Sequence, residues 1–253
     1  KTFIIKQLNF TYKFSDKFKV TLGSFATHVG YELVDAVDNK NYSMSYAFTY
    51  GPFFNTGIKV QYTSNKFSFM AGVSNPTDLK STIDAGSTQK TFIGQLAFLG
   101  DTGSAYFNVT SGSSNPSSDE NKTQFDFVGK KKLSKAFSLG FNGTYALTTN
   151  DLDSALDGEW FSLVGYVNFI VKESSSVAYR LEYLDAKQAT DRLGLLTGTS
   201  VIGNTLSLNY KVGNLTIIPE FRFDIASEDI FTDSNAAPKG LTAYALLATT
   251  YSF

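Results

Sequence analysis

Few residues in this sequence could carry out chemistry. It contains a single histidine, His28, and no cysteine, which excludes thiol catalysis, disulfide bonds and sites with several histidine or cysteine metal ligands. His28 follows Ser24 by four positions and precedes Asp35 and Asp38, a set that could form a hydrolytic site. No nucleophile motif accompanies these residues. We therefore expect His28 to hold the base of a loop, and we expect no catalytic residue and no cofactor.

Oxygen ligands for calcium are a second possibility. Asp35, Asp38, Asn39 and Asn41 lie close together in the sequence, but their spacing does not match a known calcium-binding loop. An ordinary capped turn explains the same residue types, since Asp and Asn side chains often bond to nearby backbone groups. We expect no metal site.

A third group of ionisable residues lies in segments of alternating hydrophobicity. Its members are Lys59, Asp126, Lys130, Arg180, Glu182, Glu220, Arg222 and Asp224. Some of them could form acid–base pairs, but an apolar residue stands on each side of most of them. This pattern favours a water-facing wall that carries both signs of charge.

The elements that position these residues have a period of two. From position 215 to 225, apolar residues at odd positions alternate with mostly polar residues at even positions, and the last segment, 241–253, alternates in the same way. Successive side chains of a strand point to opposite faces, so each segment has one apolar face and one polar face. The same alternation recurs along the chain, without a competing helical period, and predicts about thirteen strands in residues 1–253.

The connections between these strands alternate in length. Short connections are centred on residues 15–16, 64–65, 101–102, 134–135, 173–174 and 213–214. Long ones cover residues 28–56, 76–89, 113–121, 150–158, 187–200 and 227–240. This alternation predicts an up-and-down antiparallel sheet, and in outer-membrane barrels the tight turns lie on the periplasmic side.

The apolar face is expected to meet lipid. A barrel of about thirteen strands encloses a lumen too wide for side chains to fill, so an apolar inner face would leave an empty space. Ionic side chains near mid-strand would each cost up to several kcal/mol if they faced lipid, and little if they faced water. We therefore predict an all-β fold, a transmembrane antiparallel up-and-down β-barrel that forms a single domain over residues 1–253.

Composition agrees with this fold. Apolar residues make up 42% of the chain and charged residues 18%, and no apolar run reaches the roughly 18 residues of a spanning helix. The net charge of −1 gives no basic footprint, so no nucleic acid is expected as a partner. The terminal Tyr251-Ser252-Phe253 resembles the aromatic signal that delivers bacterial barrels to their insertion machinery. Strand parity further suggests that at least one N-terminal strand is missing and that the chain begins inside the barrel.

One stretch of about thirty-five residues carries a family resemblance. Its motifs are Gly23-x-Phe25-x-x-His28-x-Gly30-x-Glu32, Asp38-Asn39-x-Asn41-Tyr42-Ser43-x-Ser45 and Gly51-Pro52-Phe53-x-x-Thr56-Gly57. These residues resemble the signature of a family of outer-membrane β-barrel porins, and the plan also resembles general porins. The resemblance implies a complete barrel of about sixteen strands and a third long loop that folds into the lumen.

The loop at residues 28–56 is the expected constriction. The residues expected there are Glu32, Asp35, Asp38, Tyr42 and Tyr46, with the three acids facing lysines and arginines across the remaining opening. The alternative interpretation is an ordered extracellular loop or a strand hairpin, because residues 42–50 also alternate.

The function implied by the resemblance is a diffusion porin. A wet lumen with both charge signs would pass small hydrophilic solutes in the bacterial outer membrane, with weak ion selectivity. Membrane lipids and lipopolysaccharide, the solutes themselves, and a homotrimer or a larger envelope complex are the expected partners. Two alternatives stay open, a plugged accessory barrel in an envelope complex and an outer-membrane hydrolase that depends on His28.

Overall fold

The computed structural model describes residues 5–80, 89–113, 120–189 and 193–253. The main strands are β1 (Leu8–Lys13), β2 (Phe18–Ala26), β3 (Phe54–Ser64), β4 (Phe67–Ser74), β5 (Thr91–Gly100), β6 (Gly103–Ser113), β7 (Glu120–Lys132), β8 (Phe137–Asn150), β9 (Gly158–Lys172), β10 (Ser175–Asp185), β11 (Ser200–Val212), β12 (Leu215–Ala226) and β15 (Leu241–Tyr251). Two short strands, β13 (Phe231–Thr232) and β14 (Pro238–Lys239), pair with each other. The helical turns are η1 (Ala36–Asp38), α1 (Tyr46–Thr49), η2 (Ser154–Leu156) and η3 (Gly194–Leu196).

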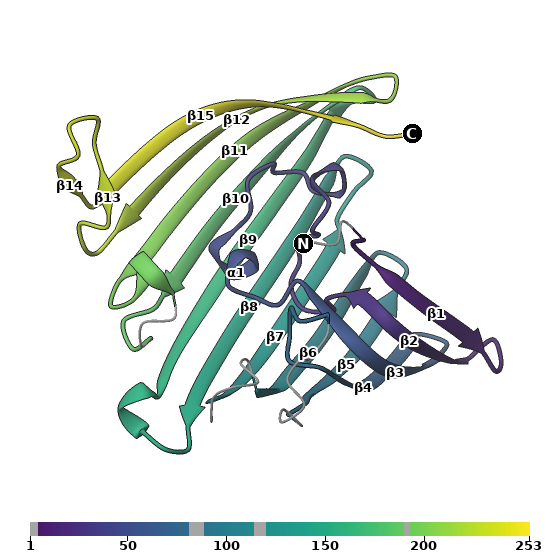
Figure 1. Cartoon of the computed structure of the whole chain (residues 1–253). Coiled ribbons are helices and arrows are strands. Elements are labelled where there is room, and N and C mark those ends of the chain that lie inside the picture. Colours follow the sequence, from purple (N-terminus) through teal and green to yellow (C-terminus); the bar gives the residue numbers. More distant parts are fainter. Residues whose placement is uncertain (1–4, 81–88, 114–119, 190–192) are drawn as a thin grey trace. The chain divides into compact units, whose positions relative to one another are not determined.

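The thirteen main strands form one sheet in chain order, from β1 through β12 to β15 (Figure 1). Each strand pairs antiparallel with its neighbours, as in β12 and β15, where Leu215 lies opposite Tyr251 and Ile225 opposite Leu241. The predicted all-β, up-and-down antiparallel fold is confirmed. Among the described residues, no pairing joins β1 to β15. None of the helices in the described ranges is long and apolar enough to cross a membrane.

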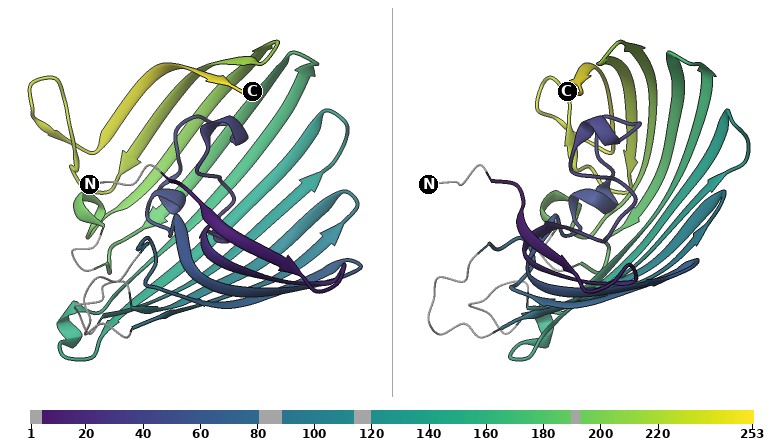
Figure 2. Two further views of the ribbon diagram at one scale, coloured as in Figure 1. Left: turned by 45° about the vertical axis from the view of Figure 1, so that its right-hand side comes forward. Right: turned by 90° about the vertical axis from the view of Figure 1, so that its right-hand side faces the viewer.

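The chain divides into two compact units. Unit 1 contains residues 1–29, 51–127 and 145–158, and unit 2 contains residues 30–50, 128–144 and 159–253. Unit 2 therefore combines β9 to β15, the tight-turn ends of β7 and β8, and the middle of the first long connection. In Figure 2, the strands of unit 2 curve around that connection, which lies on their concave side.

The two faces of the strands have the polarity of a membrane barrel. On β12, Phe221 is 52% exposed, whereas its neighbours Glu220 and Arg222 are 3% and 5% exposed. Unit 1 shows the same pattern, with Phe107 exposed next to the fully buried Asn108. Water-soluble proteins rarely expose large contiguous apolar surfaces, so a face of this kind needs a lipid environment. The predicted division into an exposed apolar parity and a covered ionic parity is confirmed, and the lining of a lumen by the ionic parity stays a prediction.

The tight turns follow local residue chemistry. Asn65, between β3 and β4, has φ 48°, and Gly213, between β11 and β12, has φ 60°. Two-residue hairpin turns require this left-handed conformation, which Asn and Gly adopt most easily. The predicted short connections therefore lie where strands end. The connection at residues 227–240 differs, because it contains the short hairpin of β13 and β14 that the alternation did not indicate.

The first long connection is neither a strand hairpin nor extended chain. Within residues 42–50, α1 begins after Ser45, whose side-chain oxygen accepts the N–H of Phe48 at 3.1 Å. A serine N-cap of this kind stabilises the first turn of a helix. The alternation in this stretch was therefore not a strand signal. Strand β3 already begins at Phe54, two residues before the predicted loop ends.

Candidate functional site

Residues 30–50, here called the docked segment, pack against the polar face of unit 2. The segment lies beside β9, β10, β11 and β12 and reaches them through ionic groups and its own backbone (Figure 2). The strands supply the ionic groups because their inward parity carries Arg180 and Glu182 on β10 and Glu220, Arg222 and Asp224 on β12.

Arg180 is the central contact. Its side chain is completely buried, and its Nη1 donates to Glu32 Oε1 at 2.7 Å and to the carbonyl oxygen of Ser43. Its Nη2 donates to the carbonyl oxygen of Met44 at 3.2 Å and to Thr205 Oγ1 at 3.0 Å. A single guanidinium thus joins two separated parts of the docked segment, and its planar set of donors suits this role.

A second group of contacts surrounds α1. The backbone N–H of Tyr46 donates to Glu182 Oε2 at 2.7 Å, and the Tyr46 hydroxyl donates to Asp224 Oδ2 at 2.8 Å. Arg222 donates through Nη1 to the Met44 carbonyl at 2.7 Å and through Nε to Asp224 at 2.9 Å. Its Nη2 lies 3.1 Å from Glu182 Oε1. These residues fix the start of α1 from both sides.

Glu220 forms the third contact. Its two carboxylate oxygens accept the backbone N–H groups of Tyr42, at 2.6 Å, and Ser43, at 3.0 Å, and one also accepts the Ser207 hydroxyl at 2.6 Å. The Asn41 side chain donates to Ser207 Oγ at 2.8 Å. A carboxylate that accepts several N–H groups is held firmly, because charge-assisted hydrogen bonds are short and strong.

These groups form one buried ionic network. Among the described residues it contains four acids, Glu32, Glu182, Glu220 and Asp224, and two arginines, and Glu220 joins it through the backbone of the docked segment. Backbone N–H groups of the docked segment compensate the excess of negative charge. Loss of one partner from a buried ion pair costs about 3–5 kcal/mol, because the other charge stays buried. The network therefore holds the segment in one position on the strands.

Tyr46 responds to the same environment. Burial raises the pKa of its hydroxyl well above the usual value, and the Asp224 carboxylate raises it further. The hydroxyl therefore stays protonated at neutral pH and donates a hydrogen bond to Asp224.

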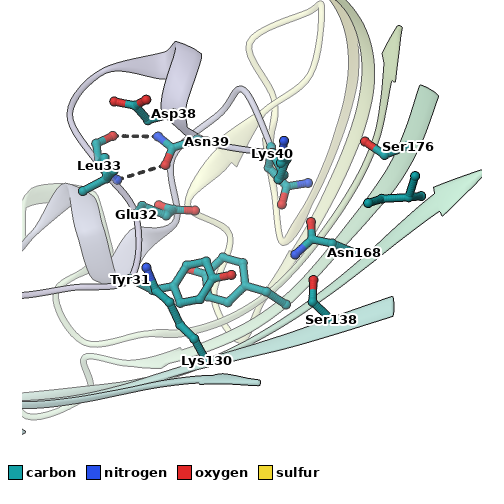
Figure 3. Close-up of a pocket in the computed structure, with 13 residues that line it drawn as sticks. Tyr31, Glu32, Leu33, Asp38, Asn39, Lys40, Lys130, Ser138, Asn168 and Ser176 are labelled. Atoms are coloured by element: carbon teal, nitrogen blue, oxygen red, sulfur yellow. Dashed lines mark hydrogen bonds between the residues drawn. The ribbon is translucent and has the colours of Figure 1, made fainter. Parts of the chain in front are cut away.

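The tight-turn side of the docked segment borders a cavity of about 270 Å³ (Figure 3). Tyr31 stacks on Tyr166 with ring centroids 4.0 Å apart, and Lys130 Nζ lies 4.6 Å from the Tyr31 centroid. The Tyr31 ring lies so close to β8 that a Cβ on Gly140 would come within 2.3 Å of it. Only glycine leaves room for this ring.

The remaining residues predicted for the constriction are placed differently. Asp35 and Asp38 are exposed, at either end of η1. Glu32 does meet an arginine, but in direct contact with Arg180 and not across an opening. Asn39 donates to the Leu33 carbonyl at 2.6 Å and accepts the Leu33 N–H at 2.9 Å, which is the geometry of a capped turn. Among the described residues, no group of three acidic or histidine side chains is arranged to hold a metal.

Lys59 and Asp126 belong to unit 1. Lys59 Nζ lies 4.0 Å from the centroid of the Phe25 ring, and Asp126 accepts from Asn108 at 2.8 Å. Both side chains lie on the covered parity of their strands, and their role in a polar lumen wall stays a prediction.

His28 also lies in unit 1, in a structural position. Its Nε2 is 3.2 Å from the Val109 carbonyl oxygen, and its own carbonyl accepts from Gln95 at 3.3 Å. Burial lowers the pKa of His28 to about 4, and Lys59 lowers it further. Ser24 Oγ is buried without a hydrogen-bond partner in the described part of the chain, so it is not activated by His28. This geometry gives no support to the hydrolytic alternative.

Sequence reasoning missed several residues of this site. Ser43 and Met44 contribute backbone carbonyls, and Ser45 contributes its N–H and hydroxyl to Glu32 at 2.8 and 2.9 Å. Backbone donors leave no signature in residue type, so only the fold reveals them. Gly203 was also missed. A Cβ there would lie 2.8 Å from Glu182 Cγ and 2.9 Å from Asp224 Oδ1.

Comparison with solved structures shows the fold. OmpT, an outer membrane protein of Vibrio cholerae, aligns with a TM-score of 0.61 at 12% identity, covering 96% of this chain and 87% of that one. An anion-selective porin from Comamonas acidovorans aligns with a TM-score of 0.60 at 13% identity, covering 91% and 70%. A porin structure refined at 1.8 Å aligns with a TM-score of 0.55 at 14% identity, covering 93% and 77%. No curated protein matches the sequence.

A family comparison is more specific. The model described as "Putative beta-barrel porin-2, OmpL-like" matches residues 1–253, the whole chain. The family, the sheet and its inside-out polarity all agree with a protein of the bacterial outer membrane. The resemblance carried by residues 23–57 pointed to the same class. The chain belongs to this OmpL-like family of β-barrel porins.

Proposed function

We propose that the protein forms a water-filled channel for the passive diffusion of small hydrophilic solutes across the outer membrane. The observation that carries this proposal is the docked segment, which is held on the polar face of unit 2 by a buried ionic network. A segment fixed at one position on the wall would narrow a channel without closing it intermittently. No chemical step is needed, since a channel selects by width and by charge.

The charges that act on a passing solute would be the exposed ones. The network acids are buried and engaged by the two arginines and by backbone N–H groups of the docked segment, so they act on a passing solute less than exposed charges do. Asp35 and Asp38 are exposed on the same segment. Replacement of both by asparagine should shift ion selectivity toward anions, measured as a change of reversal potential in planar bilayers under a salt gradient. Glu32→Gln should change selectivity less, because Glu32 bonds to Arg180. An unchanged reversal potential in the Asp35 and Asp38 variant would contradict this role.

Single-channel conductance of the purified full-length protein tests the function itself. Removal of residues 33–50 should raise the conductance, whereas a shorter deletion in another long connection, residues 229–239, should leave it unchanged. The first deletion leaves buried charges without partners, so the variant can fail to fold. A second measurement therefore uses the wild-type channel alone and determines its width from the size of the neutral polymers that it excludes. Absence of conductance in the folded protein would refute the proposal.

The alternatives predict other outcomes. A plugged accessory barrel would show very low conductance and would retain a partner of an envelope complex through purification. A hydrolase would turn over lipid and would lose this activity on His28→Ala. The exposed apolar parity would contact membrane lipids, including lipopolysaccharide, in either case. A homotrimer, proposed by analogy with general porins, is testable by the mass of the detergent-solubilised protein.

A further inference from the structure

Two neighbouring cavities lie between the docked segment and the strands of unit 2. The first, of about 270 Å³, borders β7 to β10, and the second, of about 180 Å³, borders β9 to β12 and β15. Both are lined by Asn39, Lys40, Ile170 and Ser176, so they adjoin along the same part of the docked segment. We treat these two adjoining cavities together as one groove on the tight-turn side of η1.

Lysines dominate the charge of this groove. Lys40 and Lys130 line the first cavity, and Lys40, Lys172 and Lys211 line the second. The Lys172 ammonium lies 5.9 Å from the centroid of the Tyr210 ring, at the rim of the second cavity. We call this surface the lysine groove and define it by its four lysines together with Asn168 and Asn209.

Acidic side chains balance the lysines only in part. Glu32, Asp38 and Glu173 are the acids in the lining of the two cavities. The Glu32 carboxylate is already engaged by Arg180 and by Ser45. The groove therefore keeps a surplus of positive charge next to neutral amide and hydroxyl groups.

Two of the lysines are positioned by their surroundings. The Asn209 side chain donates to the backbone carbonyl of Lys40 at 2.9 Å, which fixes the chain there. Lys130 lies over the ring of Tyr31, which is itself stacked on Tyr166. Figure 3 shows Lys40 on the docked segment and Lys130 on β7, with Asn168 on the strands beside them. A cationic site that is held in place loses less entropy when it binds a ligand.

The lysine groove lies at the basic end of unit 2. The charged residues around its tight turns are Lys130, Lys131, Lys132, Lys135, Lys172, Glu173 and Lys211. The described charged residues around its long connections are Glu159, Asp185, Lys187, Glu228, Asp229, Asp233 and Lys239. Lysines thus outnumber acids at the tight-turn end of unit 2, and acids outnumber lysines at the end of the long connections. The resulting electric field would draw anions toward the tight turns, which face the periplasm in outer-membrane barrels.

We propose that the lysine groove is a binding site for small hydrophilic solutes that carry two or more anionic groups, carboxylates or phosphates. Its lysines are divided between two adjoining cavities, so a solute with several anionic groups can engage both, whereas a monovalent one engages a single cavity. Asn168, Asn209 and Ser176 add hydrogen-bonding groups for hydroxyls of the same solute. This assignment rests on the proposed channel function and names its substrate class.

Citrate is a suitable probe, with gluconate as the monovalent hydroxylated control. In planar bilayers, citrate added on the tight-turn side should reduce the current at a lower concentration than citrate added on the other side, and gluconate should do so only weakly. In the double variant Lys40→Gln with Lys211→Gln, the citrate concentration needed for the same reduction of current should rise about tenfold, because two exposed ionic contacts are lost. Inorganic pyrophosphate in parallel distinguishes phosphate from carboxylate preference.

The matched control is Lys187→Gln with Lys239→Gln, which removes the same charge from unit 2 at its acidic end. Equal weakening by both double variants would assign the effect to overall charge and would overturn the groove. Calorimetric titration of the detergent-solubilised protein with citrate makes the result independent of conductance. Conduction without citrate binding would refute this inference and leave the channel standing, whereas citrate binding without conduction would refute the channel and leave the groove.

Discussion

Substitution of Arg180 by methionine should release the docked segment. The side chain is completely buried and donates to Glu32, Ser43, Met44 and Thr205. Its loss leaves the Glu32 carboxylate buried without its arginine, which costs about 3–5 kcal/mol. At about 1.4 kcal/mol for each factor of ten, the ratio of released to docked segment should rise by roughly two to four orders of magnitude.

Cysteine labelling can measure this ratio, because the chain contains no cysteine. Ala47 is 4% exposed and packs against Val164 and Tyr166, so Ala47→Cys should react with a thiol reagent only when the segment is released. Its labelling rate then follows the released fraction. In the Arg180→Met background the rate should increase by the factor given above, whereas Val37→Cys, at an exposed position, should label rapidly in both backgrounds.

Two further variants test the cause. Lys239→Met removes an exposed ion pair with Asp233 in the same unit. Such a pair contributes less than about 1 kcal/mol, so the labelling rate of Ala47→Cys should change by less than about fivefold. The double variant Arg180→Met with Glu32→Gln should release the segment less than the sum of the single effects, because no unpaired Glu32 charge remains. Equal labelling of Ala47→Cys in the wild-type and Arg180→Met backgrounds would refute the role of this network.

Two other predictions concern packing and protonation. Gly203→Ala should destabilise the folded protein by about 1–3 kcal/mol in urea titrations, because its Cβ would press on Glu182 and Asp224. The free energy of unfolding should also fall by up to about 3 kcal/mol as the pH drops from 6.5 to 4, because His28 has a pKa of about 4 when folded and 6.5 when unfolded, so that only the unfolded chain binds a proton there.

Each of these two predictions has a control. Gly165→Ala on β9 places its Cβ no closer than 4.0 Å to the Leu181 carbonyl oxygen and should change stability by less than about 0.5 kcal/mol. His28→Gln cannot take up a proton, so the variant should lose this part of the pH dependence while other groups keep theirs. If Gly203→Ala and Gly165→Ala destabilise the protein equally, the packing explanation is wrong. If the wild type and His28→Gln lose the same stability as the pH falls, the protonation explanation is wrong.

The strand pattern could be predicted because it depends on neighbours in the sequence. Alternation placed Phe221 on one face and Glu220 and Arg222 on the other, and the structure has them so. The turn at Gly213 was equally local, since a left-handed residue is needed there. Alternation failed over residues 42–50, where the Ser45 cap starts α1 instead of a strand. The cap, together with the bonds of the Ser45 and Tyr46 N–H groups to Glu32 and Glu182, favours a helical turn over the weak period of two.

The sequence by itself determined the sheet, its polarity, and the identity of the ionic residues on the inward parity. It could not determine their partners. Glu32 and Arg180 are 148 positions apart, and most acceptors and donors that complete the network are backbone atoms of residues 42–46. Residue type says nothing about where a backbone carbonyl or N–H points in space. That direction is set only when β10 and β12 stand beside the docked segment, so the tertiary structure alone decided how the segment is held.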